Sequence, residues 1–243
     1  MNTSGKTIVI TGGNSGIGYE LVKQLHTNNK LIIISRSQKN WVELNTLDNN
    51  IHRIQCDLSK MHDVITLADS LITKNDPIDI VVHCAAIQLT PKLTEKNFSF
   101  SGIETEINTN FTSVIWLTHR LLPKLLKRPK ASIVNITSGL AIYPKTESAV
   151  YSATKAALHS FSQSLRYQLE NTPITVTEVL LPLVDTPMTR GRGKRKMPPD
   201  IAAMKIIAAI QSEKSEVYVG KARCLPLLSR IWPKLIKNIL KRY

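Results

Sequence analysis

The stretch ITGGNSGIGYELVKQL, residues 10–25, is the most informative part of the chain, because Gly12, Gly16 and Gly18 stand between a strand-like apolar run and a helical pattern. Glycine lets the backbone turn tightly and approach a pyrophosphate, whose negative charge then lies at the positive N-terminus of the helix. A flexible turn without a ligand is the alternative. The place of the turn, after the first strand of an alternating series, favours the phosphate site.

Strand-like runs alternate with helical patterns along the whole chain. The runs cover residues 7–11, 31–35, 52–56, 80–84, 132–137, 175–181 and 216–219, and helical stretches begin near Gly16, Ser37, Ser59, Ser99, Ser148 and Pro199. Short apolar strands separated by helices are typical of a parallel sheet covered on both faces. The sequence therefore predicts an α/β fold, a single doubly wound Rossmann-type domain over residues 1–243 with seven parallel strands.

The composition indicates a globular protein with an excess of positive charge. Of the 243 residues, 42% are hydrophobic and 21% are charged, and the formal net charge is +14. This charge favours anionic partners such as a phosphorylated cofactor, nucleic acid or an acidic membrane surface. Cys56, Cys84 and Cys224 show no CxxC spacing, which indicates free thiols and no zinc site. Without a signal-peptide pattern or a run of transmembrane length, we expect a cytoplasmic protein.

Two basic segments carry much of the charge. Residues 185–198 contain RGRGKRK and follow the sixth strand, so they are expected to form a mobile substrate loop at the edge where open α/β sheets bind ligands. No recognition motif accompanies the cluster, and we therefore expect no nucleic-acid partner. A solvated loop and a loop that favours acidic substrates both remain open, and reversing the charges of Arg192 and Lys194 separates them.

The C-terminal segment, residues 225–243, has the pattern of a basic amphipathic helix. Its apolar face consists of Leu228, Ile231, Leu235, Ile236, Ile239 and Leu240. Such a helix can lie on an anionic membrane surface or pack over the substrate cleft or a neighbouring subunit. Packing is favoured, because Pro233 interrupts the pattern and the segment is short for stable anchoring.

The end of the second predicted strand, LIIISRS, bears on the choice of cofactor. An acidic residue at this point selects a dinucleotide without a 2'-phosphate, whereas a phosphorylated one needs a cation. The chain has Ser35 and then Arg36, with no carboxylate nearby in the sequence. Arg36 therefore favours NADP(H) over NAD(H), and an ordinary solvated arginine is the alternative.

The stretches ASIVNITSGLAIYP, residues 131–144, and AVYSATKAALHSFSQSLRYQLE, residues 149–170, carry the residues suited to carbonyl chemistry. Ser138 ends the predicted strand, and Tyr151 and Lys155 lie one helical turn apart on one face. We expect all three at the carboxyl edge of the sheet, where Tyr151 would donate a proton, Lys155 would lower its pKa and Ser138 would hold the substrate oxygen. Tyr19 and Lys23 share the spacing, so the spacing alone does not identify the pair.

Six motifs together resemble one known family. TGGNSGIG at 11–18, CDL at 56–58, NTN at 108–110, ITS at 136–138, YSATK at 151–155 and LPLVDT at 181–186 have the order and spacing of the short-chain dehydrogenases/reductases. The resemblance covers essentially the whole chain, and SGLAIYP, ATKAALHSFSQSLRYQL and LPLVDT resemble the DltE-type branch more narrowly. It implies an oxidoreductase that interconverts a small-molecule carbonyl and a secondary alcohol, assembled as a homodimer or homotetramer.

The resemblance also implies roles for individual residues. Ser138 and Tyr151 match the substrate-binding serine and the acid/base tyrosine, Lys155 matches the lysine that also holds the nicotinamide ribose, and Asn110 matches an asparagine of the proton relay. Asn108 competes with Asn110 but fits the family spacing less well. The expected cofactor-binding residues, with Arg36 added from its own position, are Gly12, Ser15, Gly16, Ile17, Gly18, Arg36, Asp57, Leu58, Ala85, Tyr151, Lys155, Pro182, Val184 and Thr186.

The chain departs from the family pattern at two places. His83, Cys84, Ala85 and Ala86 replace the usual NNAG, which puts the methyl group of Ala86 where the backbone usually packs close to the cofactor ribose, and Leu183 replaces a glycine. Adjacent side chains on a strand point to opposite faces, so His83 and Cys84 are expected in the core and no metal site is predicted. A catalytically silent sensor or scaffold is the alternative function, which the presence of both Tyr151 and Lys155 disfavours.

Overall fold

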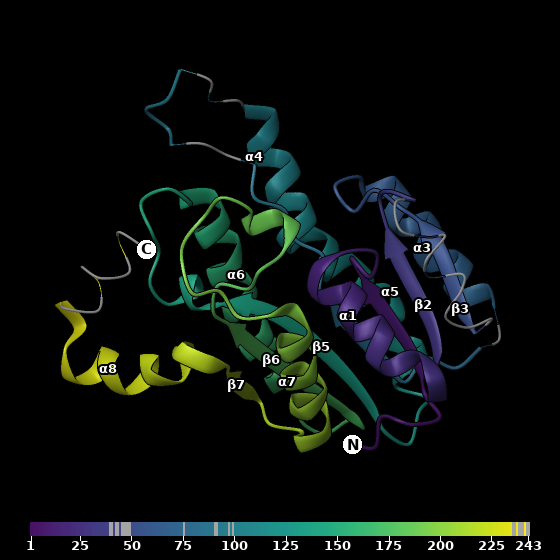
Figure 1. Ribbon diagram of the computed structural model, residues 1–243. Coiled ribbons are helices and arrows are strands. Elements are labelled where there is room, and N and C mark those ends of the chain that lie inside the picture. Colours follow the sequence, from purple (N-terminus) through teal and green to yellow (C-terminus); the bar gives the residue numbers. More distant parts are fainter. Residues whose placement is uncertain are drawn as a thin grey trace.

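A seven-stranded parallel sheet lies at the centre of the computed structural model, which describes residues 1–38, 41, 44, 50–74, 76–89, 92–96, 98, 100–234, 237 and 241 (Figure 1). The strand order is β3-β2-β1-β4-β5-β6-β7. The strands are β1 (Thr7–Thr11), β2 (Lys30–Ser35), β3 (Ile51–Gln55), β4 (Ile80–His83), β5 (Ala131–Ser138), β6 (Ile174–Leu181) and β7 (Glu216–Tyr218). The seven predicted strands and their parallel arrangement are confirmed, with bounds that differ by at most one residue.

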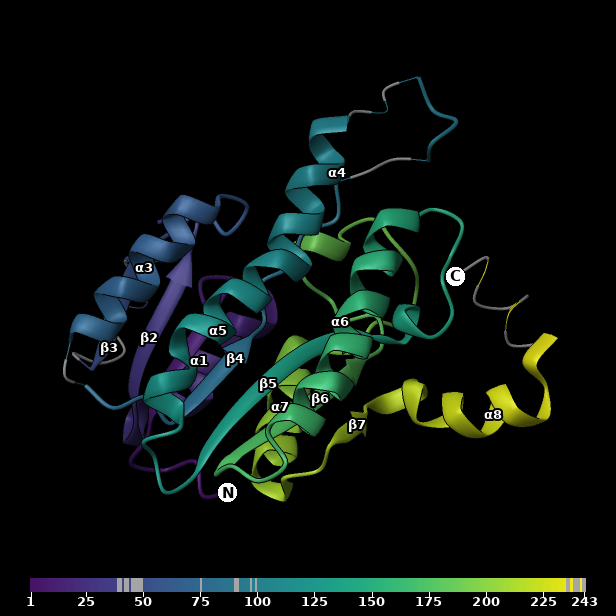
Figure 2. The ribbon, with the colours of Figure 1, turned by 180° about the vertical axis from the view of Figure 1, so that it is seen from behind.

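Helices cover both faces of the sheet, as Figures 1 and 2 show from opposite sides. They are α1 (Gly16–Leu25), α3 (Met61–Thr73), α4 (Phe100–Ile107), α5 (Ser113–Leu125), α6 (Ala149–Gln168), α7 (Pro199–Ser212) and α8 (Leu225–Ile231). One buried cluster contains side chains of α1 and α7, and another contains side chains of α3, α5 and α6. The helix expected near Ser37 falls mainly outside the described residues.

The apolar runs of the strands arise because each strand is buried on both sides. In β1, Ile8 and Ile10 belong to the cluster with α1 and α7, whereas Val9 belongs to the cluster with α3, α5 and α6. All three side chains are fully buried. Alternate residues of a strand point to opposite faces, so two covered faces require an apolar residue at every position.

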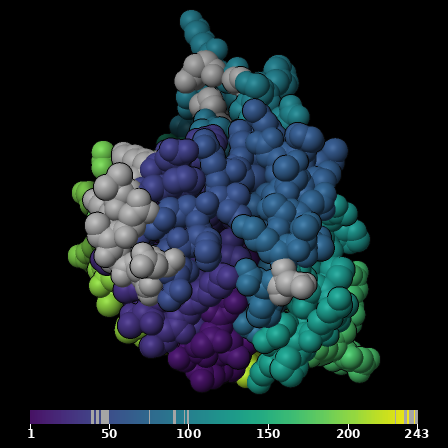
Figure 3. Space-filling model, turned by 90° about the vertical axis from the view of Figure 1, so that its right-hand side faces the viewer, coloured from purple at the N-terminus to yellow at the C-terminus, as the bar shows by residue number. Residues whose placement is uncertain are grey.

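The helical region after β4 is divided by a wide turn that the sequence pattern did not predict. α4 leads into a π-helical turn, Asn108–Thr112, which continues directly into α5. Single π-helical turns are rare and often lie at functional sites. α4 projects from the top of the molecule in Figures 1 and 2, and Figure 3 shows the flank made by the first half of the chain, in purple and blue.

The carboxyl edge of the sheet is stepped, because β5 and β6 are longer than their neighbours. His83, the last residue of β4, pairs with Asn135, whereas Ser138 pairs with Leu181. Ser138 therefore lies three residues beyond the end of β4, and the loops after β1, β4, β5 and β6 gather around it. Open α/β sheets bind their ligands at this edge.

Candidate active site

A cavity of about 850 Å³ lies along the carboxyl edge of the sheet. The turn after β1, the ends of β2, β5 and β6, the loop after β4, and the first turn of α8 contribute to its walls. The lining includes every predicted site residue except Asn110, namely Gly12, Ser15, Gly16, Ile17, Gly18, Arg36, Asp57, Leu58, Ala85, Ser138, Tyr151, Lys155, Pro182, Val184 and Thr186. The tertiary structure thus brings together residues that are up to 174 positions apart, from Gly12 to Thr186.

The turn between β1 and α1 has the shape that a bound phosphate requires. A Cβ atom added at Gly18 would lie only 2.2 Å from the carbonyl oxygen of Gly12, so no other residue fits there without a shift of the backbone. This close packing brings the first turn of α1 against the end of β1. The N-terminus of α1 then faces the cavity with backbone N–H groups, which is a favourable place for an anion.

Thr11 is a positioning residue that the sequence analysis missed. Its Oγ1 atom accepts hydrogen bonds from the backbone N–H groups of Cys84 and Ala85, each at 3.0 Å. These bonds hold the loop after β4, which lines the cavity, against the end of β1. The available signal was a threonine directly after the apolar run Ile8 to Ile10, because a buried hydroxyl needs hydrogen-bond partners.

Arg36 and Asp57 line the end of the cavity nearest β2 and β3. Arg36 is exposed, and Asp57 Oδ1 accepts hydrogen bonds from the N–H and the hydroxyl of Ser59 at 3.0 and 2.7 Å. Burial raises the pKa of the Asp57 carboxyl, but the bonds from Ser59 and the charges of Arg36 and Lys60 together lower it. The fold therefore places a carboxylate near Arg36, although the sequence around Arg36 contains none.

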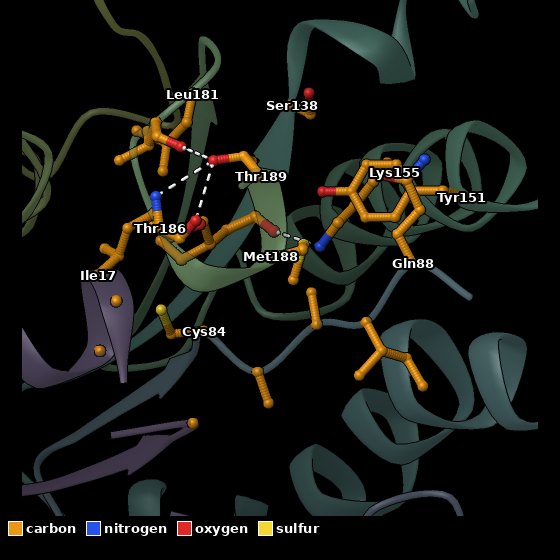
Figure 4. Close-up of a pocket in the computed structure, with 18 of the residues that line it drawn as sticks. Ile17, Cys84, Gln88, Ser138, Tyr151, Lys155, Leu181, Thr186, Met188 and Thr189 are labelled. Atoms are coloured by element: carbon orange, nitrogen blue, oxygen red, sulfur yellow. Dashed lines mark hydrogen bonds between the residues drawn. The ribbon is translucent and has the colours of Figure 1, made fainter. Parts of the chain in front are cut away.

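Tyr151 and Lys155 lie side by side on α6, as Figure 4 shows. The Lys155 Nζ atom is 5.7 Å from the centre of the Tyr151 ring, and it donates a hydrogen bond to the carbonyl oxygen of Ile136 at 2.9 Å. Ser138 caps a short 3-10 turn, Gly139–Ala141, through a hydrogen bond from the Leu140 N–H to Ser138 Oγ at 3.2 Å. The ammonium thus lies against the face of the phenol ring.

Burial governs the protonation of the Tyr151 and Lys155 side chains. It raises the pKa of the Tyr151 phenol, which Glu106 and Cys84 raise further and Arg192 lowers. It lowers the pKa of the Lys155 ammonium to about 8, against the opposite effects of Cys84 and Glu178. In the chain alone, desolvation of the phenolate therefore dominates the pKa of Tyr151, and the lowering of this pKa by Lys155 stays a prediction.

Asn110 lies behind the cavity wall, where it joins three elements. Its Oδ1 atom accepts a hydrogen bond from the N–H of Ile87, and its Nδ2 atom donates to the carbonyl oxygen of Ile87, both at 2.8 Å. Nδ2 also lies 3.3 Å from Thr154 Oγ1 on α6. Asn108 instead donates to the carbonyl oxygen of Ser59 at 3.2 Å, so of the two asparagines it is Asn110 that contacts the helix of Tyr151.

The loop at residues 185–198 forms several bonds with neighbouring segments, and its mobility stays a prediction. Val184 and Met197 form a parallel bridge at its base, and Thr189 Oγ1 donates to the carbonyl oxygen of Val184 at 2.6 Å. Arg192 reaches across to donate a hydrogen bond to Gln88 Oε1. These contacts make the loop a wall of the cavity, from which α7 begins at Pro199.

The departure at Leu183 has a partner within this loop. A Cβ atom added at Gly193 would lie 2.4 Å from Leu183 Cδ2, and Gly193 has a φ of +61°. The Leu183 side chain therefore packs against Gly193. Because Gly193 has no side chain, there is room for a leucine at position 183, where the family usually has a glycine. Ala86, the other departure, lines the cavity.

His83 and Cys84 point in opposite directions, as predicted. The His83 Nε2 atom lies 3.0 Å from Thr118 Oγ1 on α5, and burial lowers the pKa of His83 to about 3, which keeps the ring neutral. Cys84 lines the cavity and is half-buried, so the expected place in the core is confirmed for His83 only; all three cysteines are free. Within the part of the chain that the structure describes, no three potential ligands gather into a metal site.

The C-terminal helical segment is interrupted at Trp232, and its apolar residues are divided between two environments. α8 ends at Ile231, where the backbone of Trp232 leaves the helical conformation just before Pro233. Leu225 and Leu228 line the cavity, whereas Leu227, Ile231 and Trp232 are exposed. Most of the predicted helix beyond Lys234 lies outside the described residues. No helix in the described ranges has the length and hydropathy needed to cross a bilayer.

Comparisons with known proteins agree with this arrangement. The sequence profile of the short chain dehydrogenase family matches residues 6–197. The "Uncharacterized oxidoreductase DltE" of Bacillus subtilis (strain 168) is 39% identical over 200 residues, which cover 80% of this chain and 78% of that protein.

Solved structures share the fold over nearly the whole chain. A short chain dehydrogenase from Burkholderia cenocepacia J2315 in complex with NADP has a TM-score of 0.87 at 21% identity, covering 99% of both chains. A 3-ketoacyl-(acyl-carrier-protein) reductase from Brucella melitensis complexed with NADH has a TM-score of 0.80 at 22% identity, covering 90% of this chain and 98% of that one. From the family match and the relative at 39% identity, we conclude that the chain belongs to the short-chain dehydrogenase family of oxidoreductases.

Proposed function

We propose that the protein is an NADP(H)-dependent oxidoreductase that interconverts a carbonyl and a secondary alcohol. The observation that carries the proposal is that Ser138, Tyr151 and Lys155 line the same cavity as the glycine turn at the start of α1. A proton donor and an oxygen-binding hydroxyl thus share one space with a turn suited to a dinucleotide phosphate. Fold alone would not carry this proposal, because one fold hosts many reactions.

The shape of the turn supports a dinucleotide. Gly18 has no side chain, and an added Cβ atom would lie only 2.2 Å from the carbonyl oxygen of Gly12, so the turn can pack closely and the phosphates would meet the backbone N–H groups of Ser15 and Gly16. Asp57 and Leu58 would hold the adenine end, and Pro182, Val184 and Thr186 the nicotinamide end. When bound, the nicotinamide supplies or accepts the hydride.

Arg36 is the reason to propose NADP(H) over NAD(H). It is the exposed cation at the end of β2 that lines the cavity, where a 2'-phosphate would lie. Its guanidinium offers several donors to one phosphate group. Structural relatives hold NADP in one case and NADH in another, so the preference rests on this residue.

The chain's own groups are suited to hold and move the substrate proton. Because burial raises the pKa of Tyr151, its Oη atom keeps a proton at neutral pH and can donate it to a substrate oxygen. The Leu140 N–H uses an acceptor position of Ser138 Oγ, which leaves the Ser138 hydroxyl proton for the same oxygen. We propose that Lys155 holds the cofactor ribose and provides the positive charge near Tyr151. We propose that Asn110 supports α6 and belongs to the proton relay.

The first test is a thermal-shift titration with NADPH, NADP, NADH and NAD. A ligand at 100 times its dissociation constant should add about 2.7 kcal/mol of stability. Selective stabilisation by the phosphorylated pair, lost in Arg36→Glu, would support the assignment. No stabilisation by any of the four would exclude the proposed cofactor site.

The second test is turnover of a panel of ketones and aldehydes by Tyr151→Phe. Loss of a general acid should reduce kcat/KM by about 100-fold or more, with the affinity for NADPH unchanged. Tyr19→Phe is the matched control, because Lys23 Nζ lies 5.6 Å from the Tyr19 ring but neither residue lines the cavity. Binding of NADPH without turnover of any carbonyl would favour the silent sensor or scaffold.

The proposal extends to the setting of the enzyme. We propose a single cytoplasmic domain over residues 1–243 that assembles as a homodimer or homotetramer, with its substrate loop at residues 185–198. The three free cysteines support a reducing compartment. Light scattering coupled to gel filtration distinguishes these assemblies from a monomer. Binding to anionic vesicles tests the disfavoured alternative, in which the exposed apolar residues of α8 meet a membrane surface.

A further inference from the structure

Three cations from distant parts of the chain line the substrate side of the cavity. Lys145 precedes α6, Arg192 lies in the loop at 185–198, and Lys221 lies in the 3-10 turn Gly220–Cys224 before α8. The charge of Arg192 acts on both Lys145 and Tyr151, which places it near the proposed proton donor. Lys194 and Arg195, from the same basic cluster, do not line the cavity. The fold thus selects one cation of that cluster and adds two from elsewhere.

Among the residues that the structure describes, these cations have no acidic partner. Glu147, near Lys145, pairs with Lys92 at 3.6 Å, and Asp185 pairs with Lys196 at 3.1 Å. Arg192 donates to the neutral amide of Gln88. In the described part of the chain, no carboxylate forms an ion pair with Lys145, Arg192 or Lys221.

The pKa of Lys145 shows the effect of placing cations close together without an acidic partner. Burial lowers the pKa of its ammonium and the neighbouring Arg192 lowers it further, whereas Glu147 raises it. A partly desolvated cation next to a second cation is unfavourable until an anion binds between them. Cavities lined by one sign of charge also raise the local concentration of ligands of the opposite sign.

The walls beside these cations are apolar. They consist of Leu140, Leu183, Met188, Leu225 and Leu228. Leu225 of α8 packs at the reaction end of the cavity, because a Cβ atom added at Gly139, the neighbour of Ser138, would lie 3.0 Å from Leu225 Cδ1. A ligand that reaches Ser138 therefore passes apolar side chains and cations together.

We propose that the substrate of this site is an amphipathic anion, in which the reacting carbonyl or alcohol is joined to an apolar chain and to a carboxylate or phosphate group. Lys145, Arg192 and Lys221 bind the acidic group, and the leucine side chains pack against the chain. The inference rests on the proposed function, since it takes the cavity to be the reaction site. It names specificity-determining residues that the spacing of the basic cluster does not single out.

The test measures ligand binding to the full chain saturated with NADPH. Isothermal titration compares octanoate with octan-1-ol, which has the same chain length without the charge, and with octylammonium. We expect octanoate to bind at least about tenfold more tightly than octan-1-ol and octylammonium not to bind. The preference should weaken as the salt concentration rises, because salt screens charges at the cavity mouth. Octyl phosphate in a parallel titration identifies which acidic group the site prefers.

Variants assign the preference to the cavity. Lys145→Met and Arg192→Gln should each weaken octanoate binding by about 3- to 10-fold and leave octan-1-ol binding unchanged. Lys194→Gln is the matched control, since it removes one charge from the same loop outside the cavity, and its affinity for octanoate should match that of the wild type. Thermal denaturation of each variant confirms that it is folded.

The possible results test the substrate class and the proposed function separately. Equal binding of octanoate and octan-1-ol, no binding of octanoate, or an equal loss in Lys194→Gln overturns the substrate inference. The NADPH titration of the same samples is read separately. If NADPH binds while the anion preference is absent, only the substrate class is wrong, whereas failure of NADPH to bind refutes the proposed function itself.

Discussion

Replacing Thr11 by valine tests whether the end of β1 holds the cavity wall through a single hydroxyl. Valine has nearly the same shape, so the change removes one polar atom from a side chain that is only 3% exposed. The hydroxyl accepts hydrogen bonds from the N–H groups of Cys84 and Ala85, both at 3.0 Å. The variant therefore separates hydrogen bonding from packing at this point.

The expected loss of stability depends on which acceptors the N–H groups of Cys84 and Ala85 still have in the variant. The Cys84 N–H keeps a second acceptor, the carbonyl oxygen of Val82 at 3.1 Å, whereas Thr11 Oγ1 is the acceptor of the Ala85 N–H. Leaving a buried donor unsatisfied costs about 1–3 kcal/mol, and a weakened bond costs less. We therefore expect Thr11→Val to lower the free energy of unfolding by about 2 kcal/mol, which corresponds to a fall in Tm of about 4–8 °C for a chain of this size.

Urea denaturation of the wild type, Thr11→Val and Thr11→Ser measures this effect. Serine keeps the acceptor and loses only a methyl group, which should cost about 1 kcal/mol. Serine should therefore be the less damaging change. If Thr11→Val is as stable as the wild type, or if serine costs more than valine, the hydroxyl does not hold the loop after β4.

Two further predictions concern other parts of the site. Burial lowers the pKa of Lys155 to about 8, so the unfolded chain binds more protons than the folded chain between that pH and about 10.4. The free energy of unfolding of the wild type, relative to that of Lys155→Met, should therefore rise by about 3 kcal/mol across this pH range. Urea titrations at several pH values measure this difference, and a difference that does not change with pH would refute the lowered pKa. Gly193→Ala should destabilise the protein more than Gly191→Ala, because of these two glycines only Gly193 faces the Leu183 side chain. Adding Leu183→Ala to each variant should remove the difference between their Tm values. An unchanged difference would show that the leucine is not the cause.

The sequence was sufficient for the sheet and for the predicted site residues, all of which except Asn110 line the cavity, because both depend on local patterns. Apolar runs such as that of Ile8 to Ile10 reflect burial on two faces, which any covered parallel strand requires. The glycine turn is equally local, since a close backbone approach at Gly18 excludes every side chain. Ser138, Tyr151 and Lys155 reach the cavity because the strand order brings the carboxyl ends of parallel strands to one edge.

Long-range contacts decided what the sequence could not predict. The spacing of Tyr151 and Lys155 suggested an effect of one charge on the other, but the pKa of Tyr151 depends on burial by surrounding segments and on Glu106 and Cys84. Likewise, the loop at 185–198 is polar and rich in glycine, and its sequence does not predict the bridge between Val184 and Met197 or the bond from Arg192 to Gln88.

The sequence by itself determined which chemical groups are present and the order in which the strands and helices follow one another, because local patterns encode both. The tertiary structure alone decided which of the many cations meet in the cavity, since Lys145, Arg192 and Lys221 are brought together by three separate loops. It also decided the environment of Thr11, whose partners lie more than 70 positions away. Charge and hydrogen bonding act through space, so their consequences depend on distances that the order of residues does not contain.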